Sequence, residues 1–305
     1  MSTIYYNEQG YLQLVRDTLA HGVDIPDRTG VGCRALFDGK LCFDTDKQFP
    51  FSTVRLMPLR MAFEELWFFM RGKTQTKELK EKGINFWKGN TSREFLDKRG
   101  LKKHPEGDMG AAYGFQWRNF GGLHDYSSHG LRYFMSGHDQ LQEIFTGLKE
   151  DPFGRRHYTT FWNPDMSHMM ALTPCWHSHQ FVVLPNENGT LQLHLKLINR
   201  SLDTVFGAHF AIQQYALYQM VMASALGMGV GKLSCDLTHI HVYENQLEYA
   251  EELVQRDLGK AGTVTLKKPV NTLEDILGLQ WEDFFVYGLE TNPLPFKAEK
   301  PPMAV

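Results

Sequence analysis

The sequence lacks the features that mark several broad classes of protein. It has only four cysteines in 305 residues, without a CxxC pair or another close metal-ligand spacing. This pattern argues against a disulfide framework and favours reduced thiols in the cytoplasm. The formal net charge of −3 argues against a general nucleic-acid binder, because such proteins usually carry a basic field.

Long apolar runs and targeting segments are scarce as well. The longest apolar run, around residues 215–228, is interrupted by Gln219 and Ser224, so it does not read as a membrane span. The first residues are polar and contain no secretory h-region. We therefore expect a cytoplasmic protein with neither a membrane nor a nucleic-acid partner.

The sequence does contain enough apolar residues, 42%, for a substantial core, and we expect residues 1–305 to form one domain. Apolar residues at helical spacing predict helices over residues 11–19, 58–72 and 213–228. Leucines that alternate with polar residues predict a strand over residues 191–197. Helices and strands alternate without a regular βαβ rhythm, which indicates an α+β fold.

Two further stretches are typical of strands. Residues 33–43 consist of two short apolar runs around Asp38-Gly39, a dipeptide that favours a β-hairpin turn. Residues 113–120 are rich in aromatic side chains, which strands favour. We expect a hairpin at the first stretch and a strand at the second.

Cys175 is the candidate nucleophile. It follows Pro174 and lies between two apolar runs, so we expect it at a strand end, where proline keeps it out of the hydrogen-bond ladder. Arg155, Arg156 and Arg200 are candidate neighbours, and guanidinium groups lower the pKa of a thiol. The alternative is that Cys175 is one more buried, inert cysteine.

Glu65 is the candidate proton carrier. It lies in the predicted helix over residues 58–72, beside Trp67 and Phe68, so its carboxylate is expected to be partly buried. Burial raises the pKa of a carboxyl group and suits it to proton transfer. The alternative is a solvated glutamate on a helix surface.

Eleven motifs together resemble the thymidylate synthase family over nearly the whole chain, in the order in which that family carries them. The fold that this implies is a three-layer α+β fold whose mixed sheet packs against its copy in a homodimer. The motifs are Asp27-Arg28-Thr29-Gly30, Glu65, Phe86-Trp87, Gly114 to Arg118, Asp151 to Arg156, Pro174-Cys175, Gln180-Phe181, Arg200-Ser201-x-Asp203, Gly207 with Phe210, His241-x-Tyr243, and the terminal Met-Ala-Val.

The resemblance also implies roles for residues. Cys175 would add to C6 of a pyrimidine nucleotide, while Glu65 and Tyr113 complete the catalytic group. The co-substrate would be 5,10-methylenetetrahydrofolate, without a metal. Nucleotide binding would fall to Arg28, Arg200, Ser201, Asp203, Ala211, His241 and Tyr243, with Arg155 and Arg156 reaching across the dimer interface. Folate binding would fall to Phe86, Trp87, Asn90, Leu172, Asp203, Gly207, Phe210 and Val305.

This chain departs from the family pattern around the base. Ala211 stands where the family has an asparagine whose amide reads the O4 and N3 edge of uracil, and alanine has no hydrogen-bonding side chain. Trp176 replaces a histidine, His239 an aspartate and Asn199 a glutamine. His179 or His239 is a candidate for the missing polar contact.

These departures resemble the nucleotide hydroxymethylases related to the family, which replace the same asparagine to accept cytosine. They predict hydroxymethylation of dCMP or CMP as the activity. The alternative is thymidylate synthesis from dUMP, which the retained Trp87, Asn90 and Val305 favour. A distant alternative is a zinc-dependent cytosine nucleotide deaminase, with His177 and His179 on one strand face near Cys175.

Overall fold

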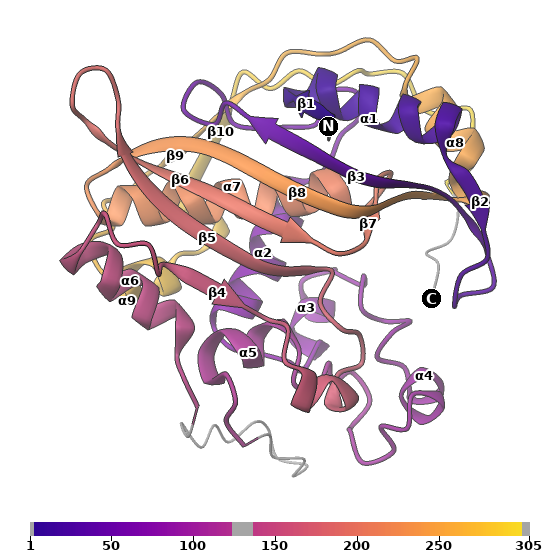
Figure 1. The fold of residues 1–305 in the computed structure, drawn as a ribbon, viewed down its shortest axis with the longest axis horizontal. Coiled ribbons are helices and arrows are strands. Elements are labelled where there is room, and N and C mark those ends of the chain that lie inside the picture. The colour runs from indigo at the N-terminus through magenta and orange to yellow at the C-terminus, as the bar shows by residue number, and fades with distance from the viewer. Residues whose placement is uncertain (1–2, 124–136, 301–305) are drawn as a thin grey trace.

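One mixed β-sheet organises the chain in a computed structural model, which describes residues 3–123 and 137–300 (Figure 1). The strands run in the order β1-β3-β8-β6-β5-β4, with β2 paired to β3 and β7 to β8. Parallel pairs join β1 to β3 and β6 to β8, and the other neighbours along that order are antiparallel. The bounds are β1 Ile4–Tyr6, β2 Val23–Ile25, β3 Cys33–Phe43, β4 Tyr158–Thr160, β5 Trp176–Pro185, β6 Leu191–Asn199, β7 Leu202–Asp203 and β8 Gly229–Tyr243.

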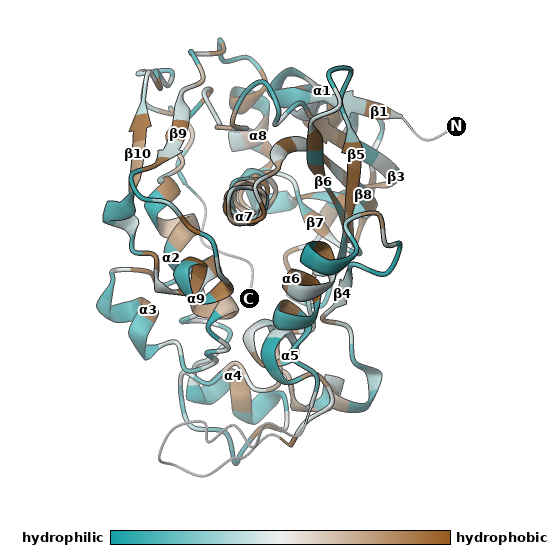
Figure 2. Cartoon of the chain, turned by 90° about the vertical axis from the view of Figure 1, so that its left-hand side faces the viewer, coloured by the Kyte–Doolittle hydropathy of each residue, from teal (hydrophilic) through white to brown (hydrophobic). Residues whose placement is uncertain are grey.

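Helices cover one face of this sheet. Figure 2 shows α7 nearly end-on between the sheet and α2, and α7 is apolar on almost every side because it is covered all round. A small antiparallel pair, β9 Thr263–Leu266 with β10 Phe284–Tyr287, lies beyond it. The helices are α1 Asn7–His21, α2 Leu59–Met70, α3 Lys77–Glu81, α4 Arg93–Lys98, α5 Tyr113–Asn119, α6 Gln140–Glu150, α7 Ala208–Ala225, α8 Leu247–Leu253 and α9 Leu273–Gly278.

The opposite face of β5, β6 and β8 carries no helix of the described residues (Figures 1 and 2). Val182 and Leu184 of β5 are 38% and 52% exposed there. The core instead lies between the sheet, α7 and α2. Among the helices in the described ranges, none is long and apolar enough to cross a membrane.

The predicted α+β class and mixed sheet are confirmed, and so are the helices that became α1 and α2 and the strand that became β6. The helix predicted over residues 213–228 begins earlier, at Ala208, and ends at Ala225. That shift places Ala211 inside the first turn of α7, with its side chain buried. The position that departs most from the family pattern therefore lies within a helix.

The predicted hairpin at residues 33–43 is wrong. This stretch is the single strand β3, paired with β8 from Cys33 opposite Tyr243 to Phe43 opposite Leu233. A type I′ turn needs a positive φ at both central residues, but only Asp38, with φ of 61°, has one. The chain therefore continues straight along its fifteen-residue partner.

The predicted strand over residues 113–120 is also wrong, because this stretch forms the helix α5. Its aromatic residues favour a strand only as an isolated segment, and tertiary contacts override that preference. Arg118 of α5 forms an ion pair with Asp139 at 2.7 Å and donates a hydrogen bond to the carbonyl oxygen of Met70. α5 thus joins the end of α2 to the start of α6.

Candidate active site

Cys175 lies immediately before β5, at the N-terminal end of that strand. Its backbone N–H donates to the phenolic oxygen of Tyr113 at 2.8 Å, and its carbonyl oxygen accepts the N–H of Arg200 at 3.0 Å. The guanidinium group of Arg200 donates to the carbonyl oxygen of Pro174 at 2.8 Å and lies 3.7 Å from the Cys175 Sγ. The thiol is therefore fixed from both sides, and a cation is beside it.

The net effect on the thiol is opposite to the one predicted. Burial raises the pKa of Cys175, and the positive charges of Arg200 and Arg28 only partly offset that effect. Arg155 and Arg156, two of the predicted neighbours, are exposed on the segment between α6 and β4. In this chain, the thiol form is thus favoured over the thiolate.

Glu65 of α2 is buried, with 7% of its surface exposed. One carboxylate oxygen accepts the indole N–H of Trp87 at 2.6 Å, and the other accepts an amide N–H of Gln214 at 2.6 Å. Burial raises the pKa of Glu65 to about 7, and these two hydrogen bonds limit the rise. A carboxyl group with such a pKa can both give and take a proton near neutral pH.

Aromatic rings connect the thiol to the carboxylate. Tyr113, which binds the backbone of Cys175, stacks on Phe69 at 5.1 Å between ring centroids and lies 6.4 Å from Trp87. Trp87 in turn donates to Glu65. The two candidate catalytic groups therefore belong to one wall of side chains from α2, α5 and the segment before β5.

Several groups that suit phosphate or sugar lie near this wall. Arg28 lies in an exposed loop, close enough to favour the thiolate of Cys175 electrostatically. Ser201 follows Arg200 and is half-buried. The rings of His241 and Tyr243 on β8 are 4.8 Å apart.

The carboxylate of Asp203 forms hydrogen bonds with backbone N–H groups in this structure. One of its carboxylate oxygens accepts the N–H groups of Val205 at 2.9 Å and Phe206 at 3.1 Å. It thereby shapes the turn that leads through Gly207 into α7. Its predicted contact with ligand is compatible with this role only through the other oxygen, which accepts a hydrogen bond from Gln246 at 3.4 Å.

The remaining residues predicted to bind folate include one aromatic pair. Phe86 packs edge-on against Phe210 with 4.9 Å between ring centroids. Asn90 is 4% exposed and its amide nitrogen has no hydrogen-bond partner in the described residues. Leu172 is half-buried three residues before Cys175, and Val305 lies outside the described residues.

Of the two histidines proposed for the missing base contact, His179 is enclosed in the core and His239 lies against a second histidine. His179 is fully buried between the rings of Trp117, Phe161 and Tyr218, and burial lowers its pKa to about 3. His239 faces His241, with 3.2 Å between their Nδ1 atoms. In the described residues, neither histidine forms a hydrogen bond with Glu65.

The shared strand face predicted for His177 and His179 is wrong as well. The register of β5 against β6 shifts between Trp176 and Ser178, so His177 falls in an irregularity of the strand. His177 is half-buried beside Trp162, whereas His179 is enclosed in the core. In the described parts of the chain, no three His, Cys, Asp or Glu side chains form a group that could hold a metal ion.

Sequence reasoning missed Gln214. It was assigned to an apolar buried helix, but it donates to Glu65 from the second turn of α7. The signal that could have found it is its spacing, because Gln214 is three residues after Ala211 and therefore shares its helix face. Any residue that replaces a lost contact at position 211 is expected at such a spacing.

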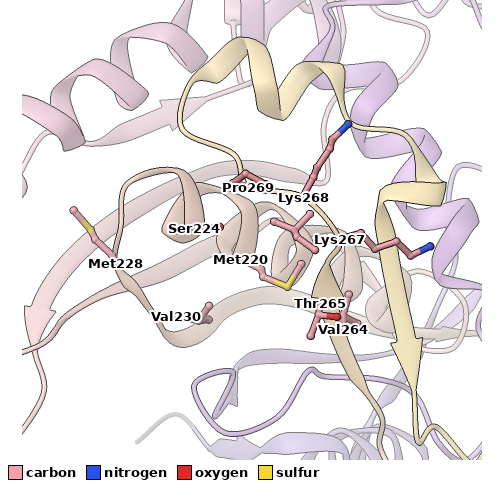
Figure 3. A pocket seen from close by; sticks show the side chains of 10 residues that line it. Met220, Ser224, Met228, Val230, Val264, Thr265, Lys267, Lys268 and Pro269 are labelled. Atoms are coloured by element: carbon pink, nitrogen blue, oxygen red, sulfur yellow. The ribbon is translucent and has the colours of Figure 1, made fainter.

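A cavity of about 570 Å³ lies away from this wall, between the end of α7, the start of β8 and β9 (Figure 3). Its lysines are already engaged: Lys267 donates to the carbonyl oxygen of Glu282, and Lys268 pairs with Asp283. None of the candidate catalytic residues lines it. The cavity is lined by Met220, Ser224, Met228, Val230, Val264, Thr265, Leu266, Lys267, Lys268 and Pro269.

Comparison with known proteins agrees with the resemblance seen in the sequence. A family model described as thymidylate synthase matches residues 9–299. The chain is 36% identical over 301 residues to the thymidylate synthase of Candida albicans, covering 94% of this chain and 95% of that protein. It is 38% identical over 271 residues to the bifunctional dihydrofolate reductase-thymidylate synthase of Leishmania major, and 39% over 268 residues to that of Crithidia fasciculata.

Each of these two matches covers 88% of this chain. The chain spans 51% of the length of the Leishmania major protein and 50% of that of the Crithidia fasciculata protein. The prediction that it hydroxymethylates a cytosine nucleotide is wrong, because relatives 36–39% identical are named thymidylate synthases. That prediction rested on several departures around the base, chiefly the absence of an amide at position 211, and the amide of Gln214 lies about one helical turn away. The matches cover nearly the whole chain, and the protein belongs to the thymidylate synthase family.

Proposed function

We propose that the protein is a thymidylate synthase that converts dUMP to dTMP with 5,10-methylenetetrahydrofolate. The observation that carries this proposal is the single wall that joins Cys175, through Tyr113 and Trp87, to the buried carboxyl group of Glu65. A nucleophile and a proton carrier on one wall suit addition to a pyrimidine ring followed by proton removal.

In the proposed reaction, the thiolate of Cys175 bonds to C6 of the pyrimidine, and the electron pair gained at C5 attacks the methylene carbon of the folate. The bonds from that carbon to the folate nitrogens break, and C5 loses its proton. Tetrahydrofolate then gives a hydride to the methylene carbon and becomes dihydrofolate. The bond between Sγ and C6 breaks at the same stage, which restores the cysteine and releases dTMP.

Two features of the site support the roles of its ionisable groups. The Arg200 guanidinium lies 3.7 Å from the Cys175 Sγ, where its charge stabilises the thiolate as it forms. The pKa of Glu65, raised to about 7, lets this side chain accept and return protons during the removal of the C5 proton and the departure of folate.

Arginines would hold the 5′-phosphate. Arg28 and Arg200 belong to the subunit that supplies Cys175, with the hydroxyl of Ser201 beside them. We assign Arg155 and Arg156 to a second copy of the chain, because both are exposed and neither influences the pKa of Cys175 in its own subunit.

The open face of β5, β6 and β8 is the surface we assign to a homodimer. Its exposed Val182 and Leu184 would lose contact with water on pairing, which favours association. The sugar hydroxyl would bind to His241 and Tyr243 at the edge of β8, where the two rings lie together.

Folate would bind on the other side of the nucleotide. The rings of Phe86, Trp87 and Phe210 provide flat apolar surface for a pterin. The buried amide nitrogen of Asn90, which has no hydrogen-bond acceptor in the described residues, fits a polar group of the co-substrate. Leu172, Asp203 and Gly207 complete this side, and Val305 is assigned to it from the family motif alone.

The test is to incubate the purified protein with dUMP and methylenetetrahydrofolate, and to weigh the nucleotide product while dihydrofolate is followed by absorbance. Formation of dTMP with one equivalent of dihydrofolate is expected. A nucleotide that gains a hydroxymethyl group, or no product in the presence of folded protein, would overturn the proposal.

A further inference from the structure

The amide of Gln214 has an orientation that the structure fixes. Its nitrogen donates to the Glu65 carboxylate at 2.6 Å and lies 3.4 Å from the carbonyl oxygen of Ala62. The carbonyl oxygen of Ala62 is an acceptor, and so is the ionised carboxylate of Glu65. While Glu65 is ionised, the nitrogen therefore faces both groups and the amide oxygen faces away. No group in the described residues donates to that oxygen, although Gln214 is only 6% exposed.

Helix geometry brings the side chain of Gln214 close to Ala211. Residues three apart on a helix share a face, and helical side chains lean toward the N-terminus, over the preceding turn. The side chain of Gln214 therefore lies over the turn that contains Ala211, which is 5% exposed. The methyl group of an alanine leaves room there that a longer side chain would fill.

This space belongs to the active site. Phe210, which precedes Ala211, packs against Phe86, and Glu65 links Gln214 to Trp87. Trp87 lies 6.4 Å from Tyr113, which holds Cys175. On the proposed function, a pyrimidine that presents C6 to the Cys175 thiol would lie against this wall, to which the Gln214 amide is joined through Glu65.

We propose that Gln214 reads the pyrimidine base, with its amide oxygen accepting the N3–H of uracil. This proposal rests on the proposed function. Cytosine carries a lone pair at N3 instead of a hydrogen, so the same oxygen would meet a second acceptor. While Glu65 is ionised, the amide cannot turn to correct this mismatch without placing its oxygen against the acceptor oxygens of Glu65 and Ala62.

Gln214 is thus a specificity-determining residue, and its orientation depends on Glu65. The contact replaces the one that an asparagine at position 211 would supply. A buried acceptor left facing another acceptor reduces binding of the wrong base by roughly ten- to a hundredfold.

The test uses Gln214→Met, which keeps the length of the side chain and removes its amide. The dissociation constants of dUMP and dCMP are measured by calorimetry. The ratio of the dCMP constant to the dUMP constant should fall roughly ten- to a hundredfold in this variant relative to the natural protein. Gln213→Met is the matched control, since Gln213 is buried on the same helix but its amide has no hydrogen-bond partner in the described residues, and its ratio should not change.

A purely structural role for Gln214 would weaken both nucleotides equally and leave the ratio unchanged, which would overturn the proposal. If Gln214→Met does not fold, Gln214→Asn keeps an amide but withdraws it by one methylene, and it should show the same loss of selectivity. Adding Ala211→Asn to the Gln214→Met variant should restore the ratio. A natural protein that makes no dTMP would refute the proposed function, whereas an unchanged ratio in an active enzyme refutes only this assignment.

Discussion

The phenolic oxygen of Tyr113 accepts the backbone N–H of Cys175 at 2.8 Å, so a residue of α5 fixes the position of a cysteine 62 residues away. This contact explains why α5 matters although it carries no candidate nucleophile. Its ring is held in turn by stacking on Phe69 of α2. Three segments distant in sequence thereby set the position of one thiol.

Removing the Tyr113 hydroxyl should lower the catalytic rate. In Tyr113→Phe the N–H of Cys175 loses its acceptor, and the resulting displacement of the thiol should lower kcat by roughly ten- to a hundredfold. The dissociation constant of dUMP should change little, because the Tyr113 hydroxyl contacts the backbone of Cys175. Steady-state kinetics and calorimetry check both values. Tyr287→Phe, on exposed β10, is the control, and an unchanged kcat in Tyr113→Phe would contradict the positioning role.

Replacing the candidate nucleophile should abolish turnover and leave binding intact. Cys175→Ser should reduce kcat by about ten-thousandfold or more, because an alcohol is far less ionised than a thiol and adds poorly to C6. The dissociation constant of dUMP should stay within about threefold, which calorimetry measures. Cys42→Ser provides the matched control, since Cys42 is half-buried on β3 and should leave activity unchanged. Substantial turnover by the Cys175 variant would remove this residue from its role.

Much of the fold follows from local patterns in the sequence, because those patterns record burial on one face. The apolar spacing of α2 and the alternation of β6 are such cases. The helical conformation of residues 113–119 does not follow from a local pattern. The ion pair between Arg118 of α5 and Asp139 joins segments that are apart in the chain. Asp38-Gly39 misleads for the same reason, because pairing with β8 decides its path.

In the candidate site, too, some properties follow from local sequence and others depend on distant contacts. The identities of Cys175 and Glu65 can be inferred from motifs, but their ionisation depends on burial in three dimensions. Burial raises the pKa of Cys175 despite the charges of Arg200 and Arg28, which sequence alone predicts with the opposite sign. Gln214 was overlooked because its partner, Glu65, is 149 residues away.

The free energy of unfolding should depend on pH because of the raised pKa of Glu65. Burial raises the pKa of this group from 4.5 to about 7, so between these values the folded protein keeps a proton that the unfolded chain releases. Stability from this source is fully present below pH 4.5 and is lost as the pH rises through 7. The loss amounts to about 3 kcal/mol.

Urea unfolding of the natural protein and of Glu65→Gln at several pH values tests this signature. The variant cannot ionise at this position, so it lacks this decline. The free energy of unfolding of the natural protein, minus that of the variant, should therefore fall by about 3 kcal/mol between pH 4.5 and pH 8. Parallel curves would mean that Glu65 ionises as readily in the folded protein as in the unfolded chain.

Arg156 should act in the active site of the other subunit. The Cys175→Ser and Arg156→Glu proteins should each be inactive, but mixing them under conditions that exchange subunits should restore activity. In a hybrid dimer, one site combines Cys175 from one subunit with Arg156 from its partner. Random reassembly gives half hybrids with one intact site each, so about a quarter of the activity should return.

The matched control mixes Cys175→Ser with Glu65→Gln. Both of these residues belong to one subunit, joined through Tyr113 and Trp87, so no hybrid site would be intact and no activity should return. Mass spectrometry of the native dimers verifies the exchange. If hybrids form and the Arg156→Glu mixture also stays inactive, Arg156 serves its own subunit, and its exposed position must be explained by a movement of the segment between α6 and β4.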